Sequence, residues 1–383
     1  MSCTLRVLHV ITGLETGGAE QMLYKLLTTP ELRPGSAVVS LTGRGTFGRK
    51  IERLGVPVLP LGMDLGIPNP FALLNLCRYW RQHSPDLVQG WMYHGNLATT
   101  LAAIHLKNPI PHCWNVRHSL HDLSREKLIH RIVIRAGGRF SRFPSSIIYN
   151  STTAMQQHEK LGYSSLVSQF IPNGFDCVRY RPDVRSRRRV RRCLGLKDET
   201  VAVGLIARYH PSKGHDLFFQ AATEVQRCHP DVLFVLAGRG VDDPNGKLVQ
   251  MVNRNYGQLN VRLLGERDAR ILLPGLDILV LASVSGDSFP NIIGEAMASA
   301  VPVVTSDVGD CASLVANFGI AVPAGNSQRL AEGILHLIDK GPEGRTALGR
   351  KARSQCLDSY SIEQIALRYR AHYDTVVSQG EVR

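Results

Sequence analysis

The feature that most constrains the fold is a repeated alternation of short apolar runs and longer segments with helical spacing. Residues 5–11 and 201–206 are apolar runs typical of buried parallel strands, and each leads through a glycine-containing loop into a helical segment, at 19–27 and 217–228. Further strand-like runs lie at 37–41, 56–61, 86–89, 111–116, 146–151, 232–237, 261–265 and 301–305. Strands that alternate with helices favour βαβ units and parallel sheets, and therefore an α/β fold.

Two such series are separated by a segment rich in turn residues. The run Phe170-Ile-Pro-Asn-Gly-Phe-Asp176 contains an Asn-Gly turn pair, and the prolines around it stop neighbouring helices. A chain of 383 residues is long enough for two domains with separate cores. We therefore expect a first domain over residues 1–172 and a second over 173–361. A C-terminal helix within 362–383 is expected to cross back onto the first domain.

The composition is that of a soluble globular protein, with 44% hydrophobic and 20% charged residues. Residues 5–11 do not have the pattern of a cleavable signal, and residues 87–106 contain polar side chains that disfavour a membrane span. The eight cysteines are scattered, with no Cys-x-x-Cys pair. This pattern indicates reduced thiols and predicts a cytoplasmic protein.

The formal net charge of +13 favours anionic partners. Nucleotides, phospholipids and nucleic acids all satisfy that condition, so the sign of the charge does not choose among them. No helix-turn-helix, zinc-binding or aromatic RNA-binding motif accompanies the charge. We therefore expect no nucleic-acid partner.

Residues 283–298, Ser-Val-Ser-Gly-Asp-Ser-Phe-Pro-Asn-Ile-Ile-Gly-Glu-Ala-Met-Ala, predict a loop and a helix behind the buried apolar run 276–282. Pro290 suits the first helical turn, and Ser288 suits the N-cap. The amides of the first turn and the positive end of the helix dipole would then form a site for a phosphate group. The residues that supply these amides are Asn291, Ile292 and Ile293.

Two carboxylates flank this helix start. Asp287 precedes the helix by a short step, and Glu295 lies on the helix with a side chain that leans back toward the N-terminus. A carboxylate in that place can accept two hydrogen bonds from a ribose diol. Two cations, Arg208 and Lys213, follow the strand-like run 201–206. They are suited to a diphosphate, because Arg binds as a fork and Lys as a point charge.

The motifs that these residues form resemble those of the retaining glycosyltransferases of family 4. The shared motifs are the acid-x7-acid spacing of Asp287 and Glu295 around Phe-Pro-Asn, Gly-Gly-Ala-Glu20 after the first strand, Arg208 with Lys213-Gly, and the Pro-Asn-Gly-x-Asp linker. This chain has Asp287-Ser288 where the family usually has Glu-Gly. The resemblance covers nearly the whole chain and implies the GT-B fold, in which two Rossmann-like domains face each other across a cleft.

The resemblance also implies roles for individual residues. The expected catalytic residues are Arg208, Lys213, Asp287 and His118. The expected donor-binding residues are Gly17, Gly18, Gly238, Phe289, Asn291, Ile292, Ile293 and Glu295. His118 occupies roughly the place of a polar family residue beside the donor sugar and the acceptor. Arg117 and His121 are open alternatives for that place.

The implied activity is transfer of a hexose from a nucleoside-diphosphate sugar, UDP- or GDP-linked, to a glycan or lipid-linked acceptor in bacterial surface-polysaccharide synthesis. The sugar nucleotide is a substrate, so no cofactor is expected. The chain has no Asp-x-Asp pair of the kind that metal-dependent transferases often use, and preorganised cations can neutralise the departing diphosphate without a metal. A GT-B sugar-nucleotide epimerase and a non-catalytic nucleotide-sugar-binding subunit are the alternatives.

The segment 124–143 predicts a basic amphipathic helix, although a Gly-Gly pair weakens its second half. Its cations recur every fourth residue, at Lys127, Arg131, Arg135 and Arg139. Residues 1–175 hold 18 Lys and Arg against 9 Asp and Glu, which favours peripheral contact with the anionic inner face of the cell membrane. A solvated face is the alternative interpretation. The basic run 185–192 predicts a solvated helix, with an anion-binding patch as its alternative.

Overall fold

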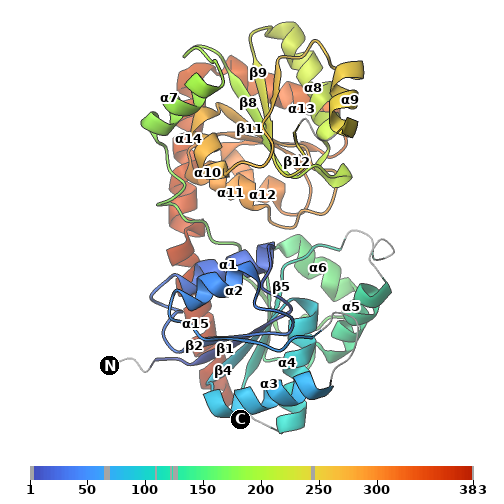
Figure 1. The fold of residues 1–383 in the computed structure, drawn as a ribbon, viewed down its shortest axis with the longest axis vertical. Helices are drawn as coiled ribbons and strands as arrows, with labels where there is room; N and C mark the ends of the chain where they lie inside the picture. Colours follow the sequence, from blue (N-terminus) through green and yellow to red (C-terminus); the bar gives the residue numbers. More distant parts are fainter. Residues whose placement is uncertain are drawn as a thin grey trace. The chain divides into compact units, whose positions relative to one another are not determined.

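The structure is a computed structural model that describes residues 4–63, 70–107, 110–120, 123, 128–242 and 246–381. The chain separates into two compact units, shown with their elements in Figure 1. The first unit comprises residues 1–174 and 362–383, and the second comprises residues 175–361. The division falls two residues beyond the boundary expected from the sequence, and the C-terminal helix belongs to the first unit.

The first unit is built on a seven-stranded parallel sheet with the order β3-β2-β1-β4-β5-β6-β7. Val7 of β1 is in register with Ser36 of β2 on one side and Leu87 of β4 on the other. The strands are β1 Val7–Ile11, β2 Ser36–Ser40, β3 Val58–Pro60, β4 Leu87–Trp91, β5 His112–Val116, β6 Ser146–Tyr149 and β7 Ser168–Phe170. The strand order reverses between β1 and β4, which is the topological switch point of a doubly wound sheet.

Helices cover both faces of this sheet, because successive strand residues point to opposite faces. Val7 and Ile11 of β1 pack with α1, α2 and α15, whereas Leu8 and Val10 pack with α3 and α4. The helices are α1 Gly18–Leu27, α2 Gly45–Glu52, α3 Pro70–His83, α4 Met92–Leu106, α5 Leu128–Phe140, α6 Thr152–Lys160 and α15 Ile362–Glu381.

The second unit repeats this arrangement with a six-stranded parallel sheet in the order β10-β9-β8-β11-β12-β13. The strands are β8 Ala202–Ile206, β9 Leu233–Ala237, β10 Val261–Leu263, β11 Ile278–Leu281, β12 Val303–Asp307 and β13 Ile320–Pro323. Its switch point lies between β8 and β11, where Val203 is in register with Ile278. Both parallel sheets confirm the predicted α/β fold.

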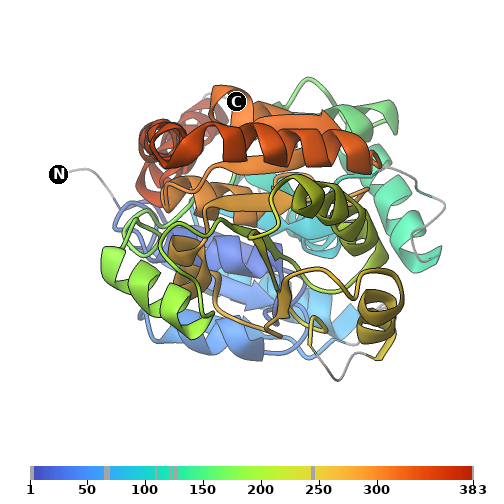
Figure 2. The same cartoon turned by 90° about the horizontal axis from the view of Figure 1, so that it is seen from above.

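The helices of the second unit also lie on both faces of its sheet. Phe234 and Leu236 of β9 pack with α8, α9 and α13 in one core cluster, whereas Ala237 packs with α7 and α10 in another. Helices α8 and α13 lie side by side, as two views show (Figures 1 and 2). The helices are α7 Val184–Cys193, α8 His215–Cys228, α9 Gly246–Asn255, α10 Ala269–Leu272, α11 Asn291–Ala298, α12 Cys311–Val315, α13 Ser327–Asp339 and α14 Gly341–Gln355.

The prediction of a solvated helix over the basic run 185–192 is wrong for two of its arginines. Arg187 Nη2 lies 2.6 Å from Asp277 Oδ1, and Arg191 Nη1 lies 3.0 Å from Asp277 Oδ2. Arg191 is only 2% exposed, and it also donates to the carbonyl oxygens of Lys197 and Thr200. These side chains therefore anchor α7 to the body of the second unit, while Arg188 and the other exposed arginines remain on its outer face.

Helix α5 is continuous through its Gly-Gly pair. A Cβ atom on Gly137 would lie 2.1 Å from the hydroxyl oxygen of Tyr163. A glycine is required there for packing against the neighbouring segment. Residues 124–127, including Lys127, lie outside the described part of the chain. Among the described helices, we find none with the length and apolar character to cross a bilayer.

Candidate active site

The switch point of the second unit brings together the two loops that carry three of the four expected catalytic residues. The loop after β8 contains Arg208 and a short 3-10 turn, Pro211–Lys213, and the loop after β11 contains Asp287. A backbone hydrogen bond of 2.9 Å from Val284 N to Ser212 O joins the two loops. Neighbouring parallel strands end at the same edge of the sheet, which is why residues far apart in sequence meet here.

Lys213 and Asp287 form an ion pair across these loops. Lys213 Nζ lies 2.5 Å from Asp287 Oδ1, and the two side chains are 17% and 11% exposed. The other carboxylate oxygen of Asp287, Oδ2, is buried and has no hydrogen-bond partner within the described residues. A buried, unsatisfied acceptor of this kind is unusual in folded proteins and is suited to a ligand that brings hydroxyl donors.

Glycines let the surrounding backbone approach these loops. Gly214 has a φ of +61°, and a Cβ atom there would lie 2.0 Å from Ala282 O at the end of β11. Gly309 has a φ of +62°, and its Cβ atom would lie 2.2 Å from the carbonyl oxygen of Asp287. Gly238 is also a glycine of positive φ, and its added Cβ would lie 2.0 Å from Ala207 O, beside Arg208. Gly238 is thus adjacent to the loop after β8. The side chain of Arg208 on that loop is exposed.

The start of α11 differs from the prediction. Pro290, not Ser288, is the N-cap residue, and the helix begins at Asn291. Pro290 provides no side-chain cap. Asn291 and Ile292 are half-buried in the first turn, whereas the side chain of Ile293 is fully buried in the core. Because its side chain is buried, Ile293 can contribute only its backbone amide to a phosphate site.

Glu295 is 6% exposed and interacts with a residue that the sequence did not indicate. The pKa of the Tyr180 hydroxyl is raised by burial, by the nearby Glu295 carboxylate and by a hydrogen bond between the two side chains. Tyr180 lies just after the linker in the second unit. No pattern in the sequence indicated a contact between Tyr180 and Glu295.

Phe289 is buried and packs within the second unit. Its ring stacks on Phe175 with centroids 6.2 Å apart, and it lies 5.9 Å from the ring of Tyr360. The side chain therefore fixes the loop that presents Asp287. Its expected role in donor binding stays a prediction.

Gly17, Gly18 and His118 belong to the first unit. Gly17 has an extended backbone at the start of α1, and its α-carbon is covered by the carboxylate of Glu20, which would lie 2.3 Å from an added Cβ. Burial raises the pKa of Glu20. Around Gly18, nothing described lies within 4 Å of a Cβ position, so its surroundings leave space for a side chain or a ligand.

The structure describes two of the three candidates for the polar position of the first unit, Arg117 and His118. Arg117 Nη1 donates to Asn115 Oδ1 at 3.2 Å and to the Tyr369 hydroxyl at 3.1 Å, and its Nη2 donates to Asn173. Arg117 is thus fixed to the core of the first unit. His118 is half-buried after β5 and contacts Tyr93. His121 lies outside the described residues.

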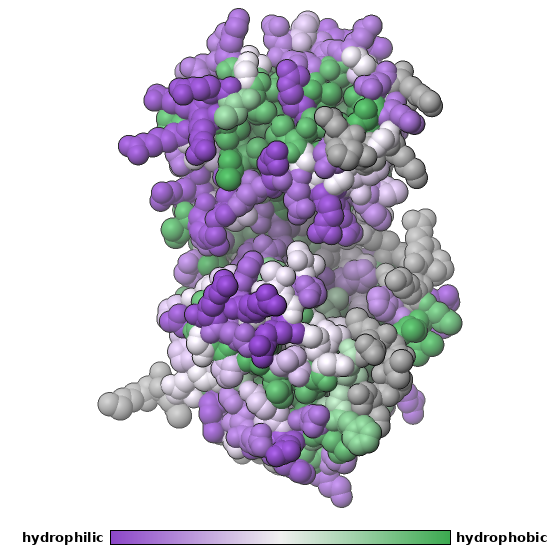
Figure 3. Space-filling view, viewed as in Figure 1, coloured by the Kyte–Doolittle hydropathy of each residue, from purple (hydrophilic) through white to green (hydrophobic). Residues whose placement is uncertain are grey.

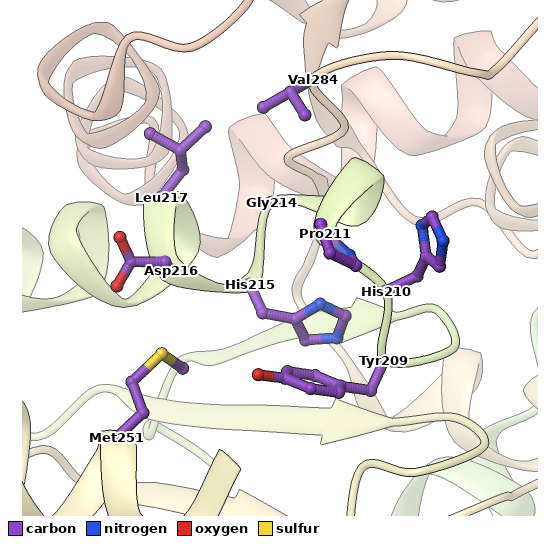
Figure 4. Close-up of a pocket in the computed structure, with 9 residues that line it drawn as sticks. All are labelled: Tyr209, His210, Pro211, Gly214, His215, Asp216, Leu217, Met251 and Val284. Atoms are coloured by element: carbon purple, nitrogen blue, oxygen red, sulfur yellow. The ribbon is translucent and has the colours of Figure 1, made fainter. Parts of the chain in front are cut away.

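A cavity of about 310 Å³ lies in the second unit beside the loop after β8 (Figure 4). It shares Gly214 and Val284 with the two switch-point loops, and Met251 of α9 lines it from another side. The rings of Tyr209 and His215 lie together in the cavity, with centroids 5.2 Å apart. Burial lowers the pKa of His215 to about 4, so its imidazole is neutral at physiological pH. No sequence pattern indicated this cavity.

Comparison with family models identifies both units. Residues 16–179 match the model described as Glycosyltransferase Family 4, and residues 200–340 match the model described as Glycosyl transferases group 1. The chain belongs to glycosyltransferase family 4. This family-4 assignment confirms the resemblance inferred from the motifs. The first match lies in the first unit apart from residues 175–179, and the second match lies in the second unit.

Curated relatives of this family-4 chain include the phosphatidyl-myo-inositol mannosyltransferase of Mycobacterium leprae. It is 28% identical over 184 residues, which cover 46% of each chain. The lipopolysaccharide core biosynthesis mannosyltransferase LpsB of Rhizobium meliloti is 25% identical over 223 residues, which cover 56% of this chain and 63% of LpsB. The chain thus spans about half to two thirds of the length of these relatives.

Solved structures with the same fold confirm the predicted GT-B architecture. HepE of Anabaena, solved with UDP, has a TM-score of 0.84 and 22% identity, covering 97% of this chain and 100% of HepE. A glycosyltransferase from Rickettsia africae has a TM-score of 0.80 and 16% identity, covering 98% of this chain and 99% of that protein.

Proposed function

We propose that this family-4 chain is a retaining glycosyltransferase that moves a hexose from a nucleoside-diphosphate sugar to a glycan or lipid-linked acceptor in surface-polysaccharide synthesis. The observation that carries the proposal is the Lys213–Asp287 pair at the β8–β11 switch point, with Arg208 on the same loop as Lys213. Ligands of α/β sheets bind at such crevices outside the carboxyl ends of the strands.

Each group at this point has a task in breaking a sugar–phosphate bond. Negative charge develops on the departing diphosphate, and Arg208 and Lys213 lie on the loop where that charge would be stabilised. The Asp287 carboxylate, with its unsatisfied Oδ2, would accept hydrogen bonds from sugar hydroxyls. Glu295 would accept hydrogen bonds from the ribose, and the first turn of α11 would bind a phosphate oxygen.

The donor is a UDP- or GDP-linked sugar in this proposal. HepE has been solved with UDP and with UDP-glucose, and an Escherichia coli relative that is 29% identical over 155 residues is a UDP-Gal-dependent galactosyltransferase by name. We infer that no metal is needed, because a guanidinium and an ammonium group can supply the positive charge that a divalent cation would otherwise bring.

The acceptor is lipid-linked in this proposal, and α5 would bring the first unit to the membrane surface. Leu128 and Ile132 are 69% and 59% exposed, and Arg135 and Arg139 are exposed on the same helix. Hydrophobic atoms gather over α5 in Figure 3. An exposed apolar strip beside a row of cations is the pattern of a helix that lies in a membrane interface. The E. coli relative acts, by name, on a diphosphoundecaprenol acceptor.

A panel of UDP- and GDP-sugars, each with and without a bacterial lipid extract, tests this proposal. We expect one donor to release its nucleoside diphosphate only when the extract is present, with a sugar added to a lipid fraction. Conversion of a sugar nucleotide to an isomer without acceptor would instead identify an epimerase. Donor binding by calorimetry with no turnover on any acceptor would identify a non-catalytic subunit. Arg329→Ala, an exposed change on α13, serves as the control variant.

A further inference from the structure

We propose that a hydrogen-bonded relay from Ala154 through His158 and Tyr93 fixes the tautomer of His118, so that its Nε2 atom is a hydrogen-bond acceptor. Tyr93 lies in the first turn of α4, His158 lies in α6, and His118 follows β5, so three segments of the first unit converge on this relay. The inference rests on the proposed function and on the role that the family resemblance implies for His118, a contact with the donor sugar and the acceptor. Tyr93 and His158 are then positioning residues.

The relay begins at a backbone carbonyl, which can only accept a hydrogen bond. His158 Nδ1 lies 2.7 Å from Ala154 O, so Nδ1 must carry a hydrogen. His158 is fully buried, and burial lowers its pKa to about 4. The imidazole is therefore neutral at physiological pH and carries a single N–H. Because that hydrogen is on Nδ1, His158 Nε2 is an acceptor.

The next link is the hydroxyl group of Tyr93, which is 9% exposed. Its oxygen lies 2.9 Å from His158 Nε2, so the single hydroxyl hydrogen of Tyr93 is donated to that nitrogen. The same oxygen lies 3.3 Å from His118 Nδ1. Because the hydroxyl hydrogen is already used, the oxygen can only accept from His118, and His118 Nδ1 must carry a hydrogen. A neutral His118 then has its lone pair on Nε2.

Packing holds the relay in one arrangement. The ring of His158 lies between aromatic neighbours, with centroids 4.9 Å from Tyr163 and 5.6 Å from Tyr149. The rings of Tyr93 and His158 are stacked with centroids 5.8 Å apart, and His118 meets the Tyr93 ring edge-on. His158 cannot turn its ring without breaking a buried hydrogen bond, which costs about 1–3 kcal/mol, and a turn of the His118 ring would break its partly buried hydrogen bond to Tyr93. Ring orientation and tautomer are thus fixed together.

The consequence for the reaction is that His118 Nε2 accepts a hydrogen bond and does not donate one. A lone pair there accepts a hydrogen bond from a hydroxyl group of the sugar or of the acceptor, whereas the opposite tautomer would present a donor to the same group. In many enzyme sites the group that hydrogen-bonds to one ring nitrogen of a histidine selects the tautomer in this way. The sequence could not reveal the relay, since residues 93, 118 and 158 are far apart along the chain.

The direct test is a two-bond ¹H–¹⁵N correlation spectrum of the full chain with ¹⁵N-labelled histidine, in which the two neutral tautomers have different patterns. The His118 signals are assigned from their loss in His118→Gln. We expect the Nδ1–H tautomer for His118 in the wild type and a mixture of tautomers in Tyr93→Phe. Tyr163→Phe is the matched control, because it removes another buried tyrosine hydroxyl from the same cluster, one that donates to Ile134 O.

Kinetics with the donor and lipid extract supply a second readout. Tyr93→Phe should lower kcat by at least about tenfold with little change in the donor KM, and Tyr163→Phe should stay near wild type. His158→Gln should retain part of the activity, because an amide oxygen can still accept from Tyr93. An Nε2–H tautomer in the wild type, or an unchanged His118 spectrum in Tyr93→Phe, would overturn the relay. These spectra test the relay even if the protein turns over no donor. A failure of the relay can therefore be distinguished from a failure of the proposed function.

Discussion

Lys213 Nζ lies 2.5 Å from Asp287 Oδ1 and thereby ties the loop after β8 to the loop after β11. The contact pairs the cation expected to bind the donor diphosphate with the carboxylate expected to bind the donor sugar. Both side chains are largely buried, so neither charge is well solvated if its partner is removed. The pair therefore links the shape of the candidate site to the stability of the second unit.

Replacing either cation of the β8 loop should strongly impair catalysis. In Arg208→Ala and Lys213→Ala we expect kcat/KM to fall by about two to three orders of magnitude, because positive charge is lost where negative charge develops. Lys213→Ala should also lower the free energy of unfolding by a few kcal/mol, since Asp287 is left buried without a counter-charge. Steady-state kinetics and urea unfolding measure both effects. Near-native rates in both folded variants would show that the diphosphate site is misassigned.

Gly309 provides a test of how precisely Asp287 must be placed. In Gly309→Ala the new Cβ atom would lie 2.2 Å from Asp287 O, so the Asp287 loop must move, and we expect kcat/KM to fall at least about tenfold. Gly325→Ala is the matched control, because Gly325 has a similarly positive φ of +76° but nothing within 4 Å of its Cβ position. Both variants should lose about 1 kcal/mol of stability from backbone strain. Equal activity in the two variants would contradict this role for the loop position.

Buried histidines make the first unit sensitive to acid. Burial lowers the pKa of His9 to about 3 and the pKa values of His112 and His158 to about 4, from an ordinary value of 6.5. Below pH 6.5 the unfolded chain therefore binds protons that the folded chain does not. Each histidine should lower the free energy of unfolding by up to about 3 kcal/mol as pH falls from 6.5 toward 4.

Urea unfolding at pH 7, 5.5 and 4.5 measures this dependence. In His112→Gln the slope of stability against pH should decrease, because one of the three groups no longer titrates. The Thr100 hydroxyl, 3.0 Å from His112 Nε2, can still bond to the amide. A free energy of unfolding that stays constant between pH 7 and pH 4.5 would argue against neutral buried imidazoles.

The fold and the candidate site could be predicted from the sequence to the extent that both follow from local pattern. Apolar strands followed by Gly-containing loops indicated parallel sheets, and parallel strands necessarily end at one edge. The resemblance to family 4 assigned Lys213 and Asp287 to one site, and the shared edge of the parallel sheet explains why their loops meet. The strand order itself places their loops at the β8–β11 switch point.

What the sequence could not predict depends on partners distant along the chain. Ser288 has the side chain of an N-cap, but the helix begins only after Pro290, and the ring of Phe289 packs against Phe175 and Tyr360. The carboxylate that pairs with Arg187 and Arg191 of α7 is distant in the sequence, because Asp277 lies more than 80 residues away. Tyr93 belongs to no recognisable motif, and only the fold brings it to His118.

Changing the cations of α5 tests the proposed membrane contact. Replacing Lys127, Arg131, Arg135 and Arg139 by Gln should weaken binding to anionic liposomes by about two to three orders of magnitude at low salt. Each basic residue near such a surface contributes roughly 1 kcal/mol. Co-sedimentation at low and high salt measures the effect, and binding of the wild type should fall as salt rises.

The control removes the same charge from α7, by changing Arg185, Arg188, Arg189 and Arg192 to Gln. These side chains are exposed, so the two variants differ in where the charge is lost and not in how much. We expect the α7 variant to bind liposomes nearly as well as the wild type. An equal loss of liposome binding in both variants would show that binding depends on the net charge and not on α5. Binding that does not change with salt concentration would contradict an electrostatic contact through α5.

The central claim is that the β8–β11 switch point transfers a sugar with its own cations and retains the anomeric configuration. The most direct measurement is NMR of the new glycosidic linkage formed on the lipid acceptor from a donor of known anomeric configuration, with the enzyme in EDTA. We predict that product forms at an unchanged rate in EDTA and that its linkage has the configuration of the donor. An inverted linkage, or a reaction that stops in EDTA and resumes with magnesium or manganese, would contradict the claim.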